Sequence, residues 1–283
     1  MNPEPVNPEP VNPEPRNENP APRTLNPAPC ASPLLLLRHE VHVWFRRTDH
    51  LAAGDIVQAE STLSIGERAR ANRFRFPDDR RDYVVAHDLL RRSLSRYEPT
   101  EPAAWQFDEG PHGRPFVRRD QDQPPIFFSL THTSGLVACA IGREQSIGVD
   151  AERTSRALTR LDVGTRILSP IEAQALDRGD ESERRLRLFE LWTLKEACAK
   201  ATGLGFLAGF RDLSFVIEGA DIIFISPPSL NDRRWLFTLF APTSDSRLAV
   251  AMGHNESEPA RVSVEEADVE GAALVPIRST REQ

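Results

Sequence analysis

One order of segments, a strand, a helix and then further strands, occurs twice along the 283 residues, before and after residues 143–147. In the first occurrence, polar and apolar residues alternate over 40–45, as in a strand, and apolar residues over 66–97 return to one helical face. Pro77 and the two acidic residues after it predict that a second helix begins inside this region. Two further strands are predicted, at 126–130 and 136–141.

The second occurrence begins with a strand predicted at 147–150. Helices are then expected at 155–168, 170–178 and 182–202, and strands at 213–217, 222–225, 235–240 and 248–252. The repeated order predicts an α+β fold of two similar α/β halves related by pseudo-twofold symmetry. We place the N-terminal half at 34–145 and the C-terminal half at 146–255.

Both ends of the chain differ from these halves in composition. Residues 1–33 hold 11 of the 24 prolines and begin with the repeated unit NPEPV. Frequent proline removes backbone donors and favours extended conformations, so a disordered tail is predicted there, and a ligand for a partner is the alternative. Residues 256–283 are expected to form a loosely held acidic tail.

The composition argues against several classes of protein. No apolar run near the start of the chain is long enough for a signal sequence or a membrane span. The net charge is −7, and the region between the two acidic ends is nearly neutral, which argues against a nucleic-acid-binding surface. Cys30, Cys139 and Cys198 are scattered and form no metal or disulfide motif. We therefore expect a cytoplasmic protein without a nucleic-acid or membrane partner.

Two carboxylates lie at the end of a predicted strand, in the segment IGVDAE. Asp150 and Glu152 are two positions apart, so on a strand they project from the same face with Cα atoms roughly 6.5 Å apart. At that spacing both can bind one hard cation. A solvated strand end is the alternative for the pair taken alone.

The helix predicted at 182–202 holds both lysines of the chain, Lys195 and Lys200, among 35 basic residues. Glu196 and Lys200 are four residues apart and share a helical face, so a surface ion pair is one interpretation. Lysine, unlike arginine, can release a proton when its surroundings lower its pKa. In a chain this rich in arginine, we expect both lysines to be present for function.

Further polar residues precede these two motifs. The segment FSLTHT predicts a polar pocket wall that contains Thr131 and His132, although a structural histidine is the alternative. Arg114 lies in a turn of sequence GRP, and a run of arginines covers 68–81. Arginine suits bidentate phosphate recognition, and a solvated helical face is the alternative for the run.

Taken in order, these segments resemble one enzyme family. The motifs FRF and DLLRR, then GRP, FSLTHT, IGVDAE, WTLKEACAK and GLG resemble the surfactin-type (Sfp-type) 4′-phosphopantetheinyl transferases over about residues 67–210. The pairing of (I/V)G(I/V)D-x-E with W-x-x-K-E-x-x-x-K some 45 residues later is highly specific. The resemblance implies transfer of phosphopantetheine from coenzyme A to a serine of an apo acyl or peptidyl carrier protein, releasing adenosine 3′,5′-bisphosphate.

The resemblance also implies a role for each matching residue. Asp150, Glu152 and Glu196 would hold Mg²⁺, Glu196 would help to deprotonate the carrier serine, and Lys200 would neutralise or protonate the leaving phosphate. Contacts with coenzyme A are implied for Arg70, Arg81 or its neighbour Arg80, Arg114, Thr131 and His132. Two positions depart from the family pattern: Arg114 replaces its usual lysine, and Ser129 replaces its common asparagine.

We therefore expect a monomeric enzyme with its site between the two halves. A metal-dependent phosphodiesterase or nuclease is one alternative, since two acids on a strand and a later acid also serve phosphodiester hydrolysis. That class predicts a basic groove, which the nearly neutral middle region does not supply. A non-catalytic module that binds coenzyme A or a carrier protein is the other alternative, and Glu196 and Lys200 argue against it.

Overall fold

The computed structural model describes residues 33–110, 113–120, 122–155, 167–203, 209–255, 259–267, 271 and 273–280. Almost all of the proline-rich tail predicted at 1–33, and most of the helix predicted at 155–168, lie outside these residues.

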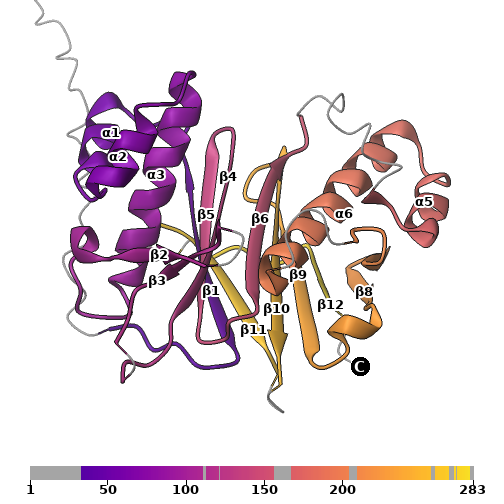
Figure 1. The fold of residues 1–283 in the computed structure, drawn as a ribbon. Helices are drawn as coiled ribbons and strands as arrows, with labels where there is room; N and C mark the ends of the chain where they lie inside the picture. Colours follow the sequence, from indigo (N-terminus) through magenta and orange to yellow (C-terminus); the bar gives the residue numbers. More distant parts are fainter. Residues whose placement is uncertain are drawn as a thin grey trace, which may run out of the picture.

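The first half of the chain forms a four-stranded sheet with helices on one face. The strand order is β11-β1-β5-β4, in which β11 comes from the end of the chain. The elements are β1 (Glu40–Arg47), α1 (Ala53–Glu60), α2 (Ile65–Ala71), α3 (Pro77–Leu94), β4 (Phe127–Thr133) and β5 (Leu136–Gly142). A short hairpin, β2 (Phe107–Glu109) with β3 (Pro115–Val117), connects α3 to β4. Figure 1 shows α1, α2 and α3 together on the outer side of this sheet.

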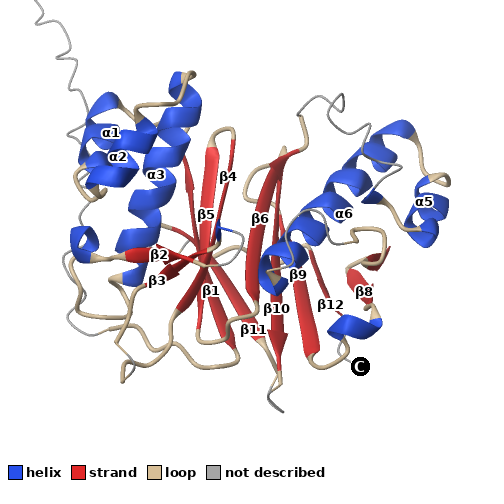
Figure 2. Ribbon diagram, viewed as in Figure 1, coloured by secondary structure: helices blue, strands red, loops and turns tan. Residues whose placement is uncertain are grey.

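The second half forms a six-stranded sheet of order β6-β10-β9-β12-β8-β7. The elements are β6 (Ile147–Arg153), α5 (Pro170–Leu176), α6 (Glu181–Thr202), β7 (Ser214–Glu218), β8 (Asp221–Ile225), β9 (Arg234–Phe240) and β10 (Ser246–His254). Two short strands complete the sheets, β11 (Arg261–Glu266) and β12 (Arg278–Thr280). The long helix α6 covers the outer side of this sheet, as α3 covers the first (Figure 2).

The two halves repeat one arrangement. In the first, β5 pairs antiparallel with both β1 and β4, and in the second, β10 pairs antiparallel with both β6 and β9. The helix that connects the outer two strands of each triplet, α3 or α6, packs on the face away from the other half. The predicted α+β fold of two similar halves is confirmed.

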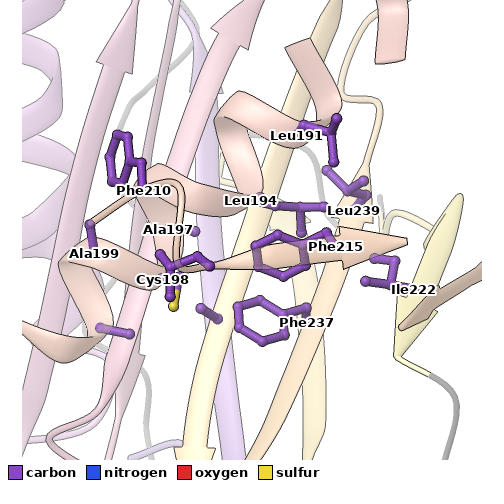
Figure 3. Packing of buried hydrophobic residues seen from close by; sticks show 14 of the residues in the cluster. Leu191, Leu194, Ala197, Cys198, Ala199, Phe210, Phe215, Ile222, Phe237 and Leu239 are labelled. Atoms are coloured by element: carbon purple, nitrogen blue, oxygen red, sulfur yellow. The ribbon is translucent and has the colours of Figure 1, made fainter. Parts of the chain in front are cut away.

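Alternating side chains of the strands divide the core into three layers. Between the sheets lie Val41 and Val43 of β1 against residues of the second sheet such as Val149 and Val250. A second cluster lies between α3 and its sheet, and a third between α6 and its sheet. Figure 3 shows this third cluster, with Leu194 and Cys198 of the helix directed at the phenylalanines of the sheet. Because both sheet faces are covered, the core strands are apolar on both sides.

Helix α6 has a clear start and end in the sequence. At its start, the Asp180 carboxylate accepts a hydrogen bond from the Glu183 amide (2.8 Å), and the Glu183 carboxylate accepts one from the Asp180 amide (3.3 Å). Such a capping box satisfies two of the helix donors that have no partner within the helix. At its end, Gly203 adopts a left-handed conformation (φ 70°), which glycine adopts without strain.

Gly148 allows α6 to approach β6 closely. A Cβ atom at Gly148 would lie 2.0 Å from the Ala197 carbonyl oxygen and 2.6 Å from the Ala201 amide nitrogen. Both atoms belong to the helix backbone and cannot move aside without shifting the helix. The absence of a side chain at this position therefore sets the distance between β6 and α6.

The end of the chain differs from the prediction of a loosely held acidic tail at 256–283. In β11, Val262 pairs with Val41 and Val264 with Val43, so this strand extends the first sheet in parallel with β1. Strand β12 pairs with β8 and β9 in the second sheet. The prediction is therefore wrong for 261–266 and 278–280. No helix among the described residues is both long and apolar enough to cross a bilayer.

Candidate active site

Strand β6 presents its two acidic side chains to α6. Its odd-numbered residues lie in the apolar layer between the sheets, as Ile147 and Val149 do. Its even-numbered residues face α6: Gly148 contacts the helix backbone, Asp150 contacts Lys200, and Glu152 contacts Trp192. The strand extends to Arg153, beyond the end predicted at 150, so both acids belong to it. The expected shared face of Asp150 and Glu152 follows from this alternation.

The two oxygens of the Asp150 carboxylate differ in their hydrogen bonding. Its Oδ1 accepts hydrogen bonds from Lys200 Nζ (2.7 Å) and Thr131 Oγ1 (3.1 Å). Its Oδ2 is buried and has no hydrogen-bond partner among the described residues. A buried carboxylate oxygen without a partner costs free energy, since it has lost water and gained nothing. This oxygen is therefore suited to a ligand that the protein alone does not provide.

Glu196 is partly buried on the face of α6 that points toward these acids. Burial raises the pKa of its carboxyl to about 7, and the charge of Asp150, with a smaller effect from Glu152, acts in the same direction. The ammonium of Lys200 lowers this pKa but does not offset the other effects. Burial and the two neighbouring carboxylates therefore oppose ionisation of Glu196, and a bound cation would favour its ionised form.

The three acids do not form a closed metal cage. Glu152 Oε1 accepts a hydrogen bond from Trp192 Nε1 (3.0 Å), and Lys200 occupies one oxygen of Asp150. In the part of the chain that the structure describes, no three histidine, cysteine or acidic side chains are grouped closely enough to hold a metal ion. The ligand atoms fit a hard cation nevertheless, because all of them are oxygens and one, Asp150 Oδ2, is buried with no partner from the described residues.

The two lysines of α6 lie in different environments. Lys200 Nζ lies at the acidic site, where it also donates to the Val149 carbonyl (3.0 Å). Lys195 is fully buried, and its ammonium pairs with Glu172 at 2.7 Å and donates to the carbonyls of Ile167, Phe210 and Leu213. The expectation that both lysines serve the chemistry is therefore wrong for Lys195, which connects α6 to α5, to the residue Ile167 before α5 and to the segment after α6.

Removing the Lys195 ammonium is expected to destabilise the fold. In Lys195→Met the Glu172 carboxylate, which is also buried, would lose its only cationic partner among the described residues. Breaking a buried ion pair from one side costs about 3 kcal/mol or more. Chemical denaturation should show this loss, and Glu172→Gln in the same chain should restore part of it. Unchanged stability of Lys195→Met would contradict the structural role.

A pocket of about 290 Å³ opens beside Glu196 and Lys200 and is lined by both halves of the chain. The N-terminal half contributes the GRP turn and β4, and α6 contributes the other wall. The lining residues are Gly113, Arg114, Pro115, Phe128, Ser129, Leu130, Glu196, Ala199, Lys200 and Gly203. This volume is close to the lower limit of small-ligand sites. Its position matches the expected location of the site between the halves.

Arg114 is held at this pocket by two carbonyl groups. Its Nη2 donates to the Gln145 and Ile147 carbonyls, both at 3.2 Å, and burial lowers the pKa of its guanidinium. Gly113, the residue before it, has a positive φ of 74°, which explains the glycine of the GRP turn. The turn thus places a cation on the pocket wall opposite α6.

The hydroxyl groups of β4 connect the two halves. Ser129 Oγ accepts from the Val149 amide (3.1 Å), and Thr131 Oγ1 accepts from the Ala151 amide (3.3 Å). These amides lie on the edge of β6 that has no strand partner in its sheet. The two hydroxyl groups therefore accept the hydrogen bonds that the backbone of a neighbouring strand would otherwise accept. Ser129 and Thr131 are both buried, and Thr131 also donates to Asp150. Strands β4 and β6 accordingly lie side by side (Figure 1).

His132 is exposed beside this junction, on the opposite face of β4 from Thr131. Partial desolvation lowers its pKa, Asp82 opposes that effect, and Lys200 and His87 lower the pKa further. The neutral imidazole of His132 is therefore favoured more than in a free histidine, and the side chain lies in the electrostatic environment of α3 as well as of α6.

The arginines expected to contact a coenzyme lie on α2 and α3. The Arg70 guanidinium lies 5.7 Å from the centre of the Tyr83 ring. Arg81 donates to Asp78 (2.8 Å) and to Asp82 (3.2 Å). Arg80 pairs with Glu60 of α1 at 2.6 Å. Each of these groups is thus held at the surface of the first half by a neighbour.

One residue at this junction was not singled out from the sequence. Arg153, directly after the DAE motif, pairs with Asp49 of the first half (3.2 Å) and with Asp245 of the second (2.8 Å). Its Nε also donates to the Ser134 carbonyl (2.8 Å). The end of β6 that carries Glu152 is therefore fixed to both halves. An arginine next to a candidate acid is the signal that could have identified it.

Family comparisons cover both halves. A model described as the 4′-phosphopantetheinyl transferase superfamily matches residues 146–251, and one described as 4′-phosphopantetheinyl transferase, N-terminal, matches 52–143. The division between the two matches falls at the joint of the halves.

Known proteins give the same result. 4′-Phosphopantetheinyl transferase HetI of Nostoc sp. is 33% identical over 172 residues, which are 61% of this chain and 72% of HetI. A 4′-phosphopantetheinyl transferase of Bacillus subtilis is 22% identical over 72% of this chain and 88% of its own length. 4′-Phosphopantetheinyl transferase Sfp of Bacillus subtilis strain 168 is 28% identical over 51% of this chain and 62% of Sfp. The chain therefore belongs to the 4′-phosphopantetheinyl transferase superfamily, and its activity is that of a 4′-phosphopantetheinyl transferase.

Proposed function

We propose that the enzyme takes the 4′-phosphopantetheine group from coenzyme A, transfers it to a serine hydroxyl of an apo acyl or peptidyl carrier protein, and releases adenosine 3′,5′-bisphosphate. The observation that carries this proposal is the arrangement around Asp150. Its buried Oδ2 has no hydrogen-bond partner in the described part of the chain. Glu196, whose pKa is raised by the charge of Asp150 as well as by burial, and the cation Lys200 both line the adjoining pocket. Phosphoryl transfer needs positioned carboxylates, a cation and a base, and this site offers all three.

We further propose that Asp150, Glu152 and Glu196 hold Mg²⁺. Their oxygens match the preference of this ion, which also keeps waters and phosphate oxygens as ligands and so needs no complete protein cage. When bound, the ion would supply positive charge against the pyrophosphate. The raised pKa of Glu196 supports a cation at this position, as does the Asp150 Oδ2 atom, which is buried without a partner among the described residues.

The proton of the carrier serine is assigned to Glu196. As the serine oxygen bonds to the phosphorus next to the pantetheine arm, the hydroxyl proton passes to the Glu196 carboxylate. The bond from that phosphorus to the bridging oxygen breaks, and the Lys200 ammonium neutralises the phosphate that leaves. Burial and the charge of Asp150 raise the pKa of Glu196, and a bound cation would return this carboxyl to the ionised form that can accept a proton.

The coenzyme is assigned to the pocket and to the adjoining face of the first half. Arg114 lines the pocket, and His132 lies close enough to Lys200 for that cation to lower its pKa. Arg70 and Arg81 extend positive charge from there along α2 and α3, which suits the phosphates of a nucleotide. Thr131 acts through Asp150, because its hydroxyl is already bonded to that carboxylate. Both walls of the pocket come from one chain, which supports a monomer.

Metal removal tests the magnesium assignment. After treatment with a chelator, the protein should no longer modify an apo carrier protein in the presence of coenzyme A, and Mg²⁺ should restore the reaction. The readout is the intact mass of the carrier together with the amount of adenosine 3′,5′-bisphosphate formed. Full activity in the metal-free protein would contradict the role given to Asp150, Glu152 and Glu196.

A further inference from the structure

A second pocket, of about 490 Å³, lies on the other end of α6, between this helix, α5 and β12. Six charged residues line it: Arg178, Glu183, Arg184, Arg187, Glu190 and Arg278. Arg187 precedes Glu196 by nine residues, which is about 14 Å along the helix and about half a turn around it. The pocket is therefore separate from the candidate active site and opens on the opposite face of α6.

The inner part of this pocket is built around one buried carboxylate. Glu190, which is 1% exposed, is contacted by Arg187 at 2.9 Å, by Arg278 at 3.3 Å and by Arg247 at 3.6 Å. A single carboxylate cannot neutralise three guanidinium groups. The side chains of Arg187, Arg278 and Arg247 are 30%, 20% and 11% exposed. The cluster therefore keeps an excess of positive charge that a bound anion would neutralise.

The outer part of the pocket adds further positive charge. Arg178 and Arg184 lie at the rim, and the one acidic contact of Arg184 within the described residues is a long one, to the exposed Asp177 at 3.4 Å. Four arginines and two glutamates line the pocket, which leaves an excess of two positive charges. Burial lowers the pKa of Arg187, Glu190 raises it, and Arg278 lowers it. Arg187 and Arg278 thus repel one another.

The remaining lining is small and apolar. Ala175, Leu176 and Leu186 contribute alkyl surface, and Gly179 leaves room beside them. The volume lies within the range of small-molecule sites, which combine an apolar surface with a few convergent polar groups. Guanidinium groups bind phosphate and carboxylate by paired hydrogen bonds.

We propose that this pocket binds a small organic anion, a phosphate or carboxylate attached to an apolar body. The anionic group lies between Arg187 and Arg278 and is contacted from the rim by Arg178 and Arg184. The apolar body packs on Leu176 and Leu186. The site is independent of the transfer reaction, since it shares no lining residue with the pocket at Glu196 and Lys200.

Calorimetric titration with phenyl phosphate, benzoate, inorganic phosphate and benzyl alcohol tests this site. Phenyl phosphate and benzoate represent the two possible anionic groups, and the tighter of the two identifies which one the site prefers. Inorganic phosphate lacks the apolar body and benzyl alcohol lacks the charge, so both should bind more weakly. Failure of both organic anions to bind would overturn the proposal, as would equal binding of benzyl alcohol.

Substitutions test whether the organic anion binds in this pocket. Arg178→Gln with Arg184→Gln removes two exposed guanidinium groups without touching Glu190, and it should weaken binding at least about tenfold. Arg261→Gln, an exposed change on β11, is the matched control and should leave binding unchanged. Lys200→Gln alters the other pocket and should also leave it unchanged. Binding that is lost in Lys200→Gln, or retained in the double variant, would overturn the assignment to this pocket.

Discussion

The variant Glu196→Gln is expected to transfer phosphopantetheine at least about a hundredfold more slowly than the unaltered enzyme, because a glutamine cannot accept the serine proton. It also removes one of the three negative charges proposed to hold Mg²⁺. The side chain keeps its size, and Glu196 forms no ion pair within 4.0 Å among the described residues, so the fold should remain intact. Steady-state rates with an apo carrier protein and coenzyme A measure the effect.

A matched control for this change lies on the same helix. Glu181 is an exposed glutamate in the first turn of α6, remote from the pocket, and Glu181→Gln should leave the rate within about twofold of the unaltered enzyme. Denaturation curves for both variants show whether either has lost stability. Full transfer activity in Glu196→Gln would contradict both roles proposed for this carboxylate.

Gly148→Ala is expected to destabilise the protein by more than about 4 kcal/mol, a size that marks severe steric conflict in a core. The new Cβ would lie 2.0 Å from the Ala197 carbonyl oxygen and 2.6 Å from the Ala201 amide nitrogen. Since both are backbone atoms of α6, the helix itself must move away from β6. That movement would separate Asp150 from Lys200, so the activity of any folded protein should fall as well.

Gly54→Ala provides the opposite case. A Cβ atom at Gly54, in helix α1, would have no heavy atom within 4 Å, and alanine is the better helix former. This variant should be as stable as the unaltered chain or more stable, by up to about 1 kcal/mol. Chemical denaturation of both variants makes the comparison. Equal stability of Gly148→Ala and Gly54→Ala would show that the close contact of β6 and α6 is not required.

The acidic part of the site could be predicted because its cause is local. Period-two alternation on a strand places Asp150 and Glu152 on one face, and the four-residue spacing on a helix places Glu196 and Lys200 on another. The structure directs these two faces toward each other. What alternation could not show was that β6 ends its sheet here, so that hydroxyls from β4 complete its hydrogen bonding.

The role of Lys195 was missed because composition was given more weight than helical geometry. Residues five apart on a helix differ by about 140° in direction, so Lys195 and Lys200 could not both face the same pocket. The rarity of lysine in the chain indicates that both lysines have a role, and the structure shows that the two roles differ. Lys195 satisfies Glu172 and three carbonyls in the core, whereas Lys200 lies at the acidic site.

The last strands were missed because their pairing is distant in sequence. The alternation of Val262 and Val264 is short and lies in an acidic stretch, and only β1, more than two hundred residues earlier, gives it a partner. Similarly, β12 is three residues long and is stabilised by β8 and β9. The acidic composition of this segment predicts exposure to solvent, but it does not reveal the strands with which the segment pairs. The same segment supplies Arg278 to the second pocket.

The intact mass of an apo carrier protein, measured before and after incubation with this enzyme, coenzyme A and Mg²⁺, tests the central claim most directly. The account predicts that the carrier gains the mass of one 4′-phosphopantetheine group on a serine, with an equal amount of adenosine 3′,5′-bisphosphate released. Acyl and peptidyl carriers should be tested in parallel, because either class fits the proposal. An unchanged mass for every carrier would contradict it.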